Sequence, residues 1–98
     1  MNYFFEIIDK SGRKIRLANY AWKHITKKHP MMADYIEEMQ LALKNPTAIT
    51  NSLVDNDVYH YYLYLKNKKG ANKYLFLSVK YLNDEGFVIS SYFEDKIT

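Results

Sequence analysis

Two separate segments of this chain hold the residue types that acid–base chemistry requires. His24 and His29 flank a basic stretch in the first third of the sequence, and Ser90 and Tyr92 lie near its end, within residues 88–93. An imidazole exchanges protons near neutral pH, whereas hydroxyl and ammonium groups donate hydrogen bonds to a phosphate. RNA cleavage without a metal needs these groups: a base for the 2′-hydroxyl proton, an acid for the departing 5′-oxygen and a donor to the phosphate.

His24 is the expected principal acid/base residue because of its position on a predicted helix. The pattern of residues 20–28 indicates a helix whose apolar stripe contains Trp22 and Ile25. His24 lies off that stripe, one turn from Lys28, so we expect its ring to be accessible. An ordinary exposed histidine without a chemical role is the alternative interpretation.

The other two histidines have structural interpretations. His29 directly precedes Pro30 at the junction of two predicted helices, so we expect its side chain to cap the second helix or to fill a gap beside Trp22. A supporting role in catalysis is the alternative for His29. His60 lies between aromatic residues on a predicted strand, where we expect a packed imidazole.

The sequence predicts neither a metal site nor a cofactor. His24 and His29 are five residues apart, which misses the i, i+4 spacing of two zinc ligands on one helix, and the chain has no cysteine. Asp55 and Asp57 are explained as turn residues between strands. The three glycines are widely spaced and do not form a glycine-rich phosphate loop.

The composition indicates one small domain. The chain has 98 residues, of which 48% are hydrophobic, and we expect a single domain over residues 1–98. No segment is long and apolar enough to be read as a membrane span. The first residues lack a basic region followed by a long apolar stretch, so we expect no signal peptide and a cytoplasmic location.

The net charge of +3 includes two lysine-rich clusters. One contains Lys28 beside both histidines, and the other surrounds Gly70 and contains Lys66. Such clusters are either solvated surface or phosphate contacts, and the sequence leaves both interpretations open. Tyr62 lies in a tyrosine-rich segment, which is typical either of a strand or of a platform on which bases stack.

The hydrophobic pattern predicts an α+β domain. We expect an N-terminal β-hairpin, then two helices packed on one face of a four-stranded antiparallel meander sheet. The hairpin is expected over residues 3–8 and 14–17, the helices over 20–28 and from Pro30 to Asn45, and the four strands over 47–54, 58–65, 73–81 and 86–93.

Strand alternation assigns side chains to the two faces of this sheet. The side chains expected to meet the helices are Leu75, Leu77, Val79 and Tyr81, together with Phe87, Ile89, Ser91 and Phe93. The side chains expected on the opposite face are Ser78, Lys80, Ser90 and Tyr92, joined by His60, Tyr62 and Tyr64. His24 and Ser90 would then point to opposite sides of the sheet, unless a sheet edge or strong twist brings them together.

The order of these elements and three short motifs resemble a known group of nucleases. The motifs are Trp22…His24-Ile25…His29-Pro30 on the first helix, Asn45-Pro46 before a strand, and Phe87-Val88-Ile89-Ser90-Ser91-Tyr92 at the end. From about Lys14 to Ile97 the chain is similar to the small phage- and mobile-element-associated nucleases of the Barnase-EndoU-colicin E5/D-RelE-like (BECR) superfamily. The resemblance implies a two-helix, four-stranded fold and metal-independent RNA cleavage, often in a toxin.

The resemblance also implies residue roles and partners. His24 corresponds to the histidine of the first helix, His29 to its companion, and Ser90 to the Ser or Thr after the apolar pair of the last strand. We expect RNA as the substrate, a cognate antitoxin or another protein as a partner, and substrate contacts from Lys28, Lys80, Tyr62 and Lys66. The alternative is a non-catalytic RNA- or protein-binding module on the same fold, encoded by a phage or mobile element.

Overall fold

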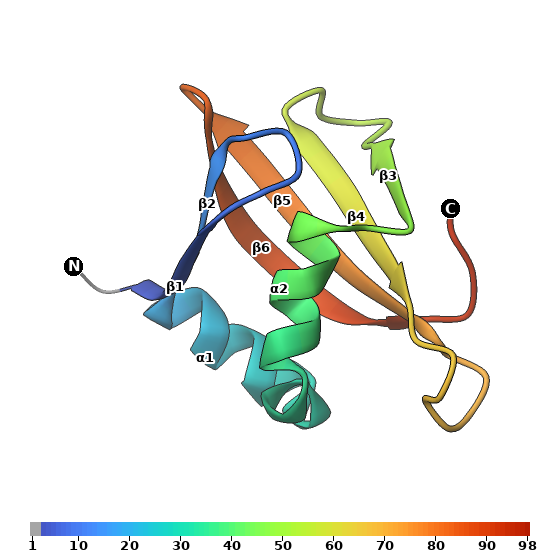
Figure 1. Ribbon diagram of the computed structural model, residues 1–98. Coiled ribbons are helices and arrows are strands. Elements are labelled where there is room, and N and C mark those ends of the chain that lie inside the picture. The colour runs from blue at the N-terminus through green and yellow to red at the C-terminus, as the bar shows by residue number, and fades with distance from the viewer. Residues whose placement is uncertain (1–2) are drawn as a thin grey trace.

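The computed structural model describes residues 3–98 and has an α+β architecture, with two α-helices on one side of a six-stranded mixed sheet (Figure 1). The elements are β1 (Tyr3–Ile8), β2 (Lys14–Ala18), α1 (Asn19–Lys28), the 3₁₀ helix η1 (Pro30–Asp34), α2 (Ile36–Lys44), β3 (Ala48–Asn51), β4 (Val58–Tyr64), β5 (Tyr74–Leu82) and β6 (Glu85–Glu94). The strand order is β1-β2-β6-β5-β4-β3. Met1 and Asn2, which belong to the expected domain 1–98, lie outside the described residues.

The N-terminal hairpin is part of the main sheet, which therefore has six strands instead of the expected four. β2 pairs with β6 in parallel, through Lys14–Arg16 and Glu85–Phe87. Ile15 and Leu17 of β2 are fully buried. An isolated two-stranded hairpin is marginal in water, whereas pairing with β6 places these side chains over the common core. Arg16 also forms ion pairs with glutamates of β1 and β6.

The segment between α1 and β3 contains two short helical elements rather than one continuous helix. Pro30 occupies the first turn of η1, as its missing N–H allows. Tyr35 then leaves the helical conformation, with φ −124° and ψ 28°, and separates η1 from α2. Met32 of η1 and Met39 of α2 are both fully buried, so the apolar stripe expected for one helix is divided between two.

The core lies between the helices and one face of the sheet. On β5 the buried side chains Leu75, Leu77 and Val79 face α2, as strand alternation predicts. From α1, Ala21 and Ile25 reach the same core because they are four residues apart on one helix face.

A β-bulge in β6 changes the expected orientation of its first half. Ser78 of β5 aligns with Ser90, but its neighbour Val79 aligns with Val88, so Ile89 has no partner across the ladder. As a result Val88 enters the core with 4% exposure, whereas Ile89, expected to face the helices, is 46% exposed. Bulges bend a strand and increase its twist, and this one directly precedes the segment that contains Ser90 and Tyr92.

A buried carboxylate connects the β1–β2 turn to the centre of the sheet. Asp9 is 5% exposed, and its two oxygens accept hydrogen bonds from the Tyr61 and Tyr81 hydroxyls and from Ser11 and Arg13. Burial opposes ionisation of Asp9, but these hydrogen bonds outweigh it and hold its pKa below the ordinary value. Burial also raises the pKa of Tyr61 to about 12, so the phenol remains a donor.

Over residues 3–98, the helices are too short or too polar to cross a lipid bilayer.

Candidate active site

A small cavity lies at the edge of the sheet, between the C-terminal half of α1 and β6. Its volume is about 180 Å³, and we refer to it as the edge cavity. The residues that line it are His24, Ile25, Lys28, His29, Ser90, Ser91 and Tyr92. The cavity thus brings together all four residues that the sequence predicts to be catalytic, from segments more than 60 positions apart.

The wall formed by α1 follows from helical phase. Ile25 is anchored in the core, with 1% exposure, and fixes the rotation of the helix about its axis. His24 and Lys28, four residues apart, then share the adjacent face and remain exposed. His24 therefore has the accessibility expected of it, and it borders a cavity rather than open solvent alone.

The opposite wall exists because β2 is short. β2 pairs with β6 only as far as Phe87, after which the chain turns into α1. The later part of β6 is therefore covered by α1 instead of by another strand. This edge position resolves the geometric question raised by strand alternation, because His24 and Ser90 approach the same cavity around the side of the sheet.

His29 belongs to the cavity rather than to a helix cap. Its backbone N–H donates to Ile25 O at 2.7 Å and its carbonyl accepts from Met32, but its side chain makes no capping hydrogen bond. The imidazole instead packs beside the Tyr92 ring, with the ring centroids 5.3 Å apart. The expected structural role as a cap was therefore wrong.

Tyr92 is held in place by a row of aromatic side chains. Its ring lies 4.8 Å from that of Phe76, which in turn lies 5.4 Å from that of Tyr62. Burial first, and then the negative charge of Glu94, raise the pKa of Tyr92 above the ordinary phenol value. The phenol is therefore neutral at physiological pH and able to donate a hydrogen bond to an anion.

The two hydroxyls next to Tyr92 are used differently. Ser91 is fully buried, and its Oγ donates to Phe76 O at 2.8 Å, so this hydroxyl is occupied within the sheet. Ser90 is partly exposed at the cavity. Of the two serines, Ser90 is thus the one whose hydroxyl is not used within the sheet among the described residues.

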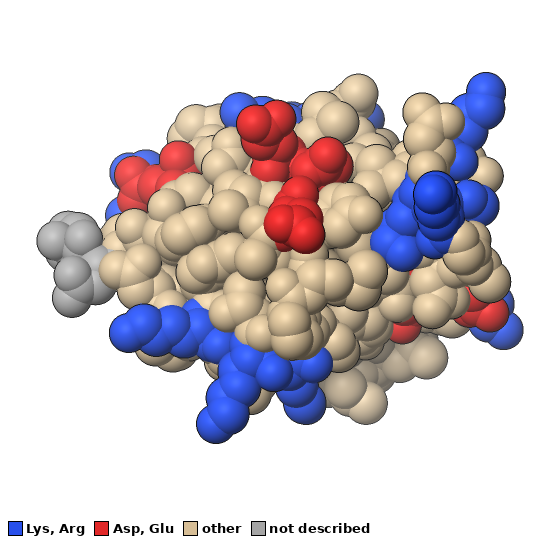
Figure 2. Space-filling view, turned by 90° about the horizontal axis from the view of Figure 1, so that it is seen from below, with Lys and Arg blue, Asp and Glu red and all other residues tan. Residues whose placement is uncertain are grey.

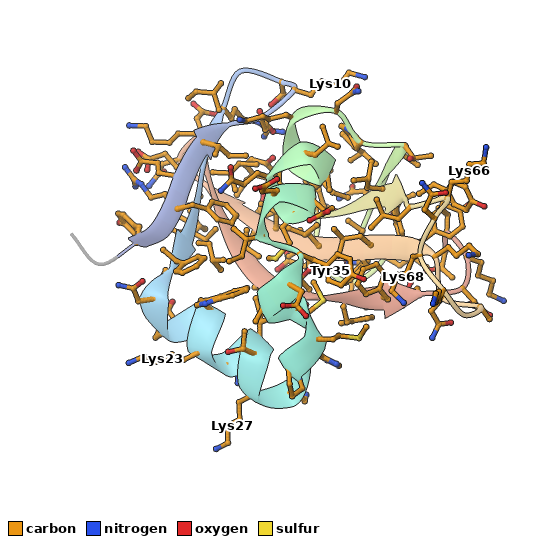
Figure 3. All side chains as sticks on the ribbon, turned by 60° about the horizontal axis from the view of Figure 1, so that its bottom comes forward. Lys10, Lys23, Lys27, Tyr35, Lys66 and Lys68 are labelled. Atoms are coloured by element: carbon orange, nitrogen blue, oxygen red, sulfur yellow. The ribbon has the colours of Figure 1, made fainter. Side chains whose placement is uncertain are left out.

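Positive charge lies on both sides of this region. Figure 2 shows two large groups of Lys and Arg side chains at the two sides of one face, with acidic side chains as well as uncharged surface between them. Figure 3 shows that Lys23 and Lys27 extend from α1, whereas Lys66 and Lys68 extend from the loop between β4 and β5. Only Lys28 of these clusters lines the edge cavity among the described residues.

Three residues predicted to contact the substrate lie elsewhere. Lys80 forms an ion pair with Asp55, Nζ to Oδ2 2.6 Å, and does not line the cavity. Tyr62 is fully buried, and its hydroxyl is 3.1 Å from Thr98 Oγ1. Lys66 lines a different cavity, of about 370 Å³, beside Tyr35. Alternation placed Lys80 on the right face of β5 but could not show which end of the strand is near α1.

Sequence reasoning missed the residues of a second cavity that adjoins the edge cavity. Met31, Lys68 and Asn72 line a second cavity of about 350 Å³ that also includes His29 and Tyr92. The lysine cluster around Gly70 was the available signal, but nothing in the pattern distinguished Lys68 from Lys66. The distinction depends on how the loop folds back toward β6.

The edge cavity has the composition needed for acid–base chemistry on an anionic substrate. It contains two imidazoles, a partly exposed serine hydroxyl, a neutral phenol and an ammonium group. Over residues 3–98, no group of three or more His, Cys, Asp or Glu side chains is arranged to hold a metal ion. Together with the α+β fold, this defines a protein with a basic, imidazole-lined site at a sheet edge.

Comparisons with protein-family models, with curated proteins and with solved structures find no match for this chain.

Proposed function

We propose that this protein is a metal-independent endoribonuclease that cleaves RNA by attack of a 2′-hydroxyl on the adjacent phosphate. The observation that carries the proposal is that His24, His29, Ser90 and Tyr92 line one cavity. Two imidazoles can perform the two proton transfers of this reaction, because one accepts a proton while the other donates one. A site with both, and with donors for the phosphate, matches the requirements of the reaction.

The proposed reaction is balanced by the groups present. One histidine removes the 2′-hydroxyl proton, the 2′-oxygen forms a bond to phosphorus, and the bond from phosphorus to the 5′-oxygen breaks. The other histidine supplies a proton to the departing 5′-oxygen. The products are a 2′,3′-cyclic phosphate and a 5′-hydroxyl, with His24 as the principal acid/base group and His29 as the second.

Ser90, Tyr92 and Lys28 are assigned to the phosphate. Negative charge increases on the non-bridging oxygens as the fifth bond to phosphorus forms, so fixed donors lower the barrier most at that point. The neutral Tyr92 phenol and the Ser90 hydroxyl donate hydrogen bonds, and the Lys28 ammonium supplies charge. Lysine contributes a point charge rather than the two-pronged contact that an arginine would offer.

The size of the edge cavity favours a segment of a polymer over a whole small molecule. Pockets for small ligands usually measure about 300–1,000 Å³, whereas the edge cavity measures about 180 Å³. A sugar–phosphate link could enter such a cavity while the rest of an RNA chain remains on the surface. The basic groups on either side would meet neighbouring phosphates.

The resemblance to BECR nucleases supports the same proposal and adds a setting. Toxins of this kind act inside cells, so we propose a cytoplasmic, toxin-like enzyme with a cognate antitoxin as protein partner. The sheet has six strands rather than the four that the resemblance implies: β3 to β6 pair antiparallel, β2 joins β6 in parallel, and β1 pairs with β2.

The test is cleavage of single-stranded RNA by purified protein in EDTA, with detection of cyclic-phosphate ends. His24→Ala and His29→Ala should each lower the rate by about 10²–10⁴-fold. His60→Ala is the matched control, because His60 packs against Phe76 and does not line the edge cavity. Lys28→Ala should slow cleavage on the order of tenfold, whereas Lys10→Ala, at an exposed position outside both basic groups, should not.

Two results would overturn the proposal. If the parent protein and His24→Ala cleave RNA equally, the edge cavity is not the active site. If the parent binds RNA in EDTA but produces no cyclic-phosphate ends, the chain is a non-catalytic binding module.

A further inference from the structure

A second cavity of about 350 Å³ adjoins the edge cavity and has a different chemical character. We refer to it as the methionine cavity. It shares His29 and Tyr92 with the edge cavity, so these two rings form the partition between them. Its other walls come from η1, from the end of β6 and from the loop between β4 and β5.

The walls of the methionine cavity are largely apolar and aromatic. Met31 is 47% exposed at its rim, while Met32 is fully buried in its wall. Phe93 contributes a second aromatic ring and is braced by Tyr35 at 4.8 Å between ring centroids. A thioether beside two aromatic rings suits a flat, polarisable ligand, because sulfur and π-systems both interact well with such groups.

Two polar side chains at the same cavity would orient a flat ligand through hydrogen bonds and charge. Asn72 is exposed and carries both a donor and an acceptor in one amide plane. Lys68 places its ammonium 4.3 Å from the centre of the Phe93 ring, so its charge is held over the aromatic wall. The amide matches the edge of a heterocyclic base, and the ammonium matches a phosphate attached to it.

We propose that the methionine cavity binds the nucleobase of the nucleotide next to the cleaved phosphate, an inference that rests on the proposed ribonuclease function. The base packs on the Tyr92 ring and contacts Met31, beside the Phe93 ring that Lys68 covers. Asn72 hydrogen-bonds its polar edge, and Lys68 contacts the next phosphate along the chain. Because Tyr92 borders both cavities, it joins the phosphate to the base as one binding unit.

The experiment uses binding rather than cleavage, so it does not depend on catalysis. The protein is labelled with ¹³C in its methionine methyl groups and titrated with a 2′-deoxynucleoside 3′-monophosphate, which lacks the attacking hydroxyl. The Met31 and Met32 signals should shift saturably. Met39, fully buried on α2, is the internal reference and should not shift. Ribose 5-phosphate, which has no base, should leave Met31 and Met32 unchanged.

Matched variants locate the contact. Asn72→Ala should weaken nucleotide binding about three- to tenfold, the effect of one neutral hydrogen bond, and should raise KM for RNA with kcat unchanged. Asn67→Ala is the control, because Asn67 belongs to the same loop but lines the cavity beside Tyr35 instead.

Each outcome separates this inference from the function on which it rests. Absent or equal shifts with the nucleotide and with ribose 5-phosphate would overturn the base site even if RNA is cleaved. Selective methyl shifts without any RNA cleavage would support the base site and refute the nuclease. Equal weakening by Asn72→Ala and Asn67→Ala would also overturn the assignment.

Discussion

At the scale of single residues, the site depends on which polar groups remain free. Ser91 is buried and gives its hydroxyl to a main-chain carbonyl, whereas Lys80 pairs with Asp55 and does not line the edge cavity. Ser90 and Lys28 border the edge cavity instead. Residue type alone does not separate a serine that stabilises a sheet from one that can bind a phosphate; the hydrogen-bond partners do.

Tyr92→Phe tests the proposed role of the phenol. The variant keeps the ring and its packing against His29 and Phe76, but it loses the phenol hydroxyl that we assign as a donor to the phosphate. We expect cleavage to slow by about 10- to 10²-fold with unchanged thermal stability. Tyr59→Phe is the control, because Tyr59 packs against Tyr81 on the core side of the sheet. Equal rates for parent and Tyr92→Phe would remove the hydroxyl from the mechanism.

At the scale of elements, the bulge in β6 and the shortness of β2 create the cavity. In a regular strand without a bulge at Ile89, Val88 and Ser91 would point to opposite faces, because they are three residues apart. With it, both Val88 and Ser91 are buried, and the strand bends just before Ser90. The bulge therefore lets residues on both sides of it face the core. The bend that it causes changes the position of Ser90, which lines the edge cavity.

Deletion of Ile89 tests that consequence. The shortened strand should restore regular alternation with Val88 and Ser91 still in the core, so the protein should fold. Because the bend is lost, we expect the groups of the edge cavity to shift by about 1 Å or more and cleavage to fall at least about 10²-fold.

Ile89→Ala is the matched control, since it keeps the bulge and removes only a partly exposed side chain. Circular dichroism and the cleavage assay measure the two effects separately. A folded deletion variant with full activity would show that the bulge does not position the site.

The β1–β2 turn is a second element that a specific side chain, Asp9, attaches to the centre of the sheet. Asp9→Asn removes a buried charge that accepts hydrogen bonds from two phenols, and it should lower the free energy of unfolding at pH 7 by about 1–3 kcal/mol. Asp9 has a lowered pKa, so its contribution is complete above its unfolded value of about 3.9 and is lost as the pH falls through the lower folded value. Urea unfolding at pH 7 and at pH 3 measures both effects.

The parent should lose more stability than Asp9→Asn between those two pH values. Some acid sensitivity should remain in the variant, because hydrogen bonds from Arg16 and Lys80 lower the pKa of Glu6 and Asp55 as well. Asp34→Asn, at an exposed position of η1, serves as the control. Parallel pH dependence in the parent and in Asp9→Asn would refute the role of this carboxylate.

At the scale of the whole molecule, the distribution of charge matters more than its net value of +3. The lysines of α1 and those of the 66–73 loop lie on either side of the two cavities, and Lys10 lies at the end of the molecule opposite the α1 lysines (Figure 3). An RNA strand that crosses the cavities would meet both groups. These two groups are the ones that would contact phosphates under the proposed function.

Salt dependence of RNA binding tests this arrangement. With His24→Ala used to prevent cleavage, the logarithm of the association constant should fall linearly with the logarithm of salt concentration. A slope of about −2 is expected for roughly three phosphate contacts. Lys68→Ala should reduce its magnitude by about 0.7, and Lys10→Ala should leave it unchanged. Equal effects of the two substitutions would indicate diffuse attraction without a defined path.

The sequence by itself determined the local features of this protein. Helical phase placed His24 off the apolar stripe, strand alternation placed Leu75, Leu77 and Val79 in the core, and Pro30 marked the start of a new helical segment. Each of these follows from contacts within a few residues along the chain. They were sufficient to select His24, His29, Ser90 and Tyr92 as candidates.

Only the tertiary structure decided how those features combine. The parallel joining of β2 to β6, the bulge at Ile89 and the covering of the β6 edge by α1 depend on pairings between distant segments. A one-residue bulge changes which side chains face the core without altering composition or average hydrophobicity, so periodicity could not reveal it. For the same reason the sequence could not show that Lys28 and Lys68 line the two cavities whereas Lys80 and Lys66 do not. Packing determines which residues lie near a site, whereas a sequence pattern gives only residue type and spacing.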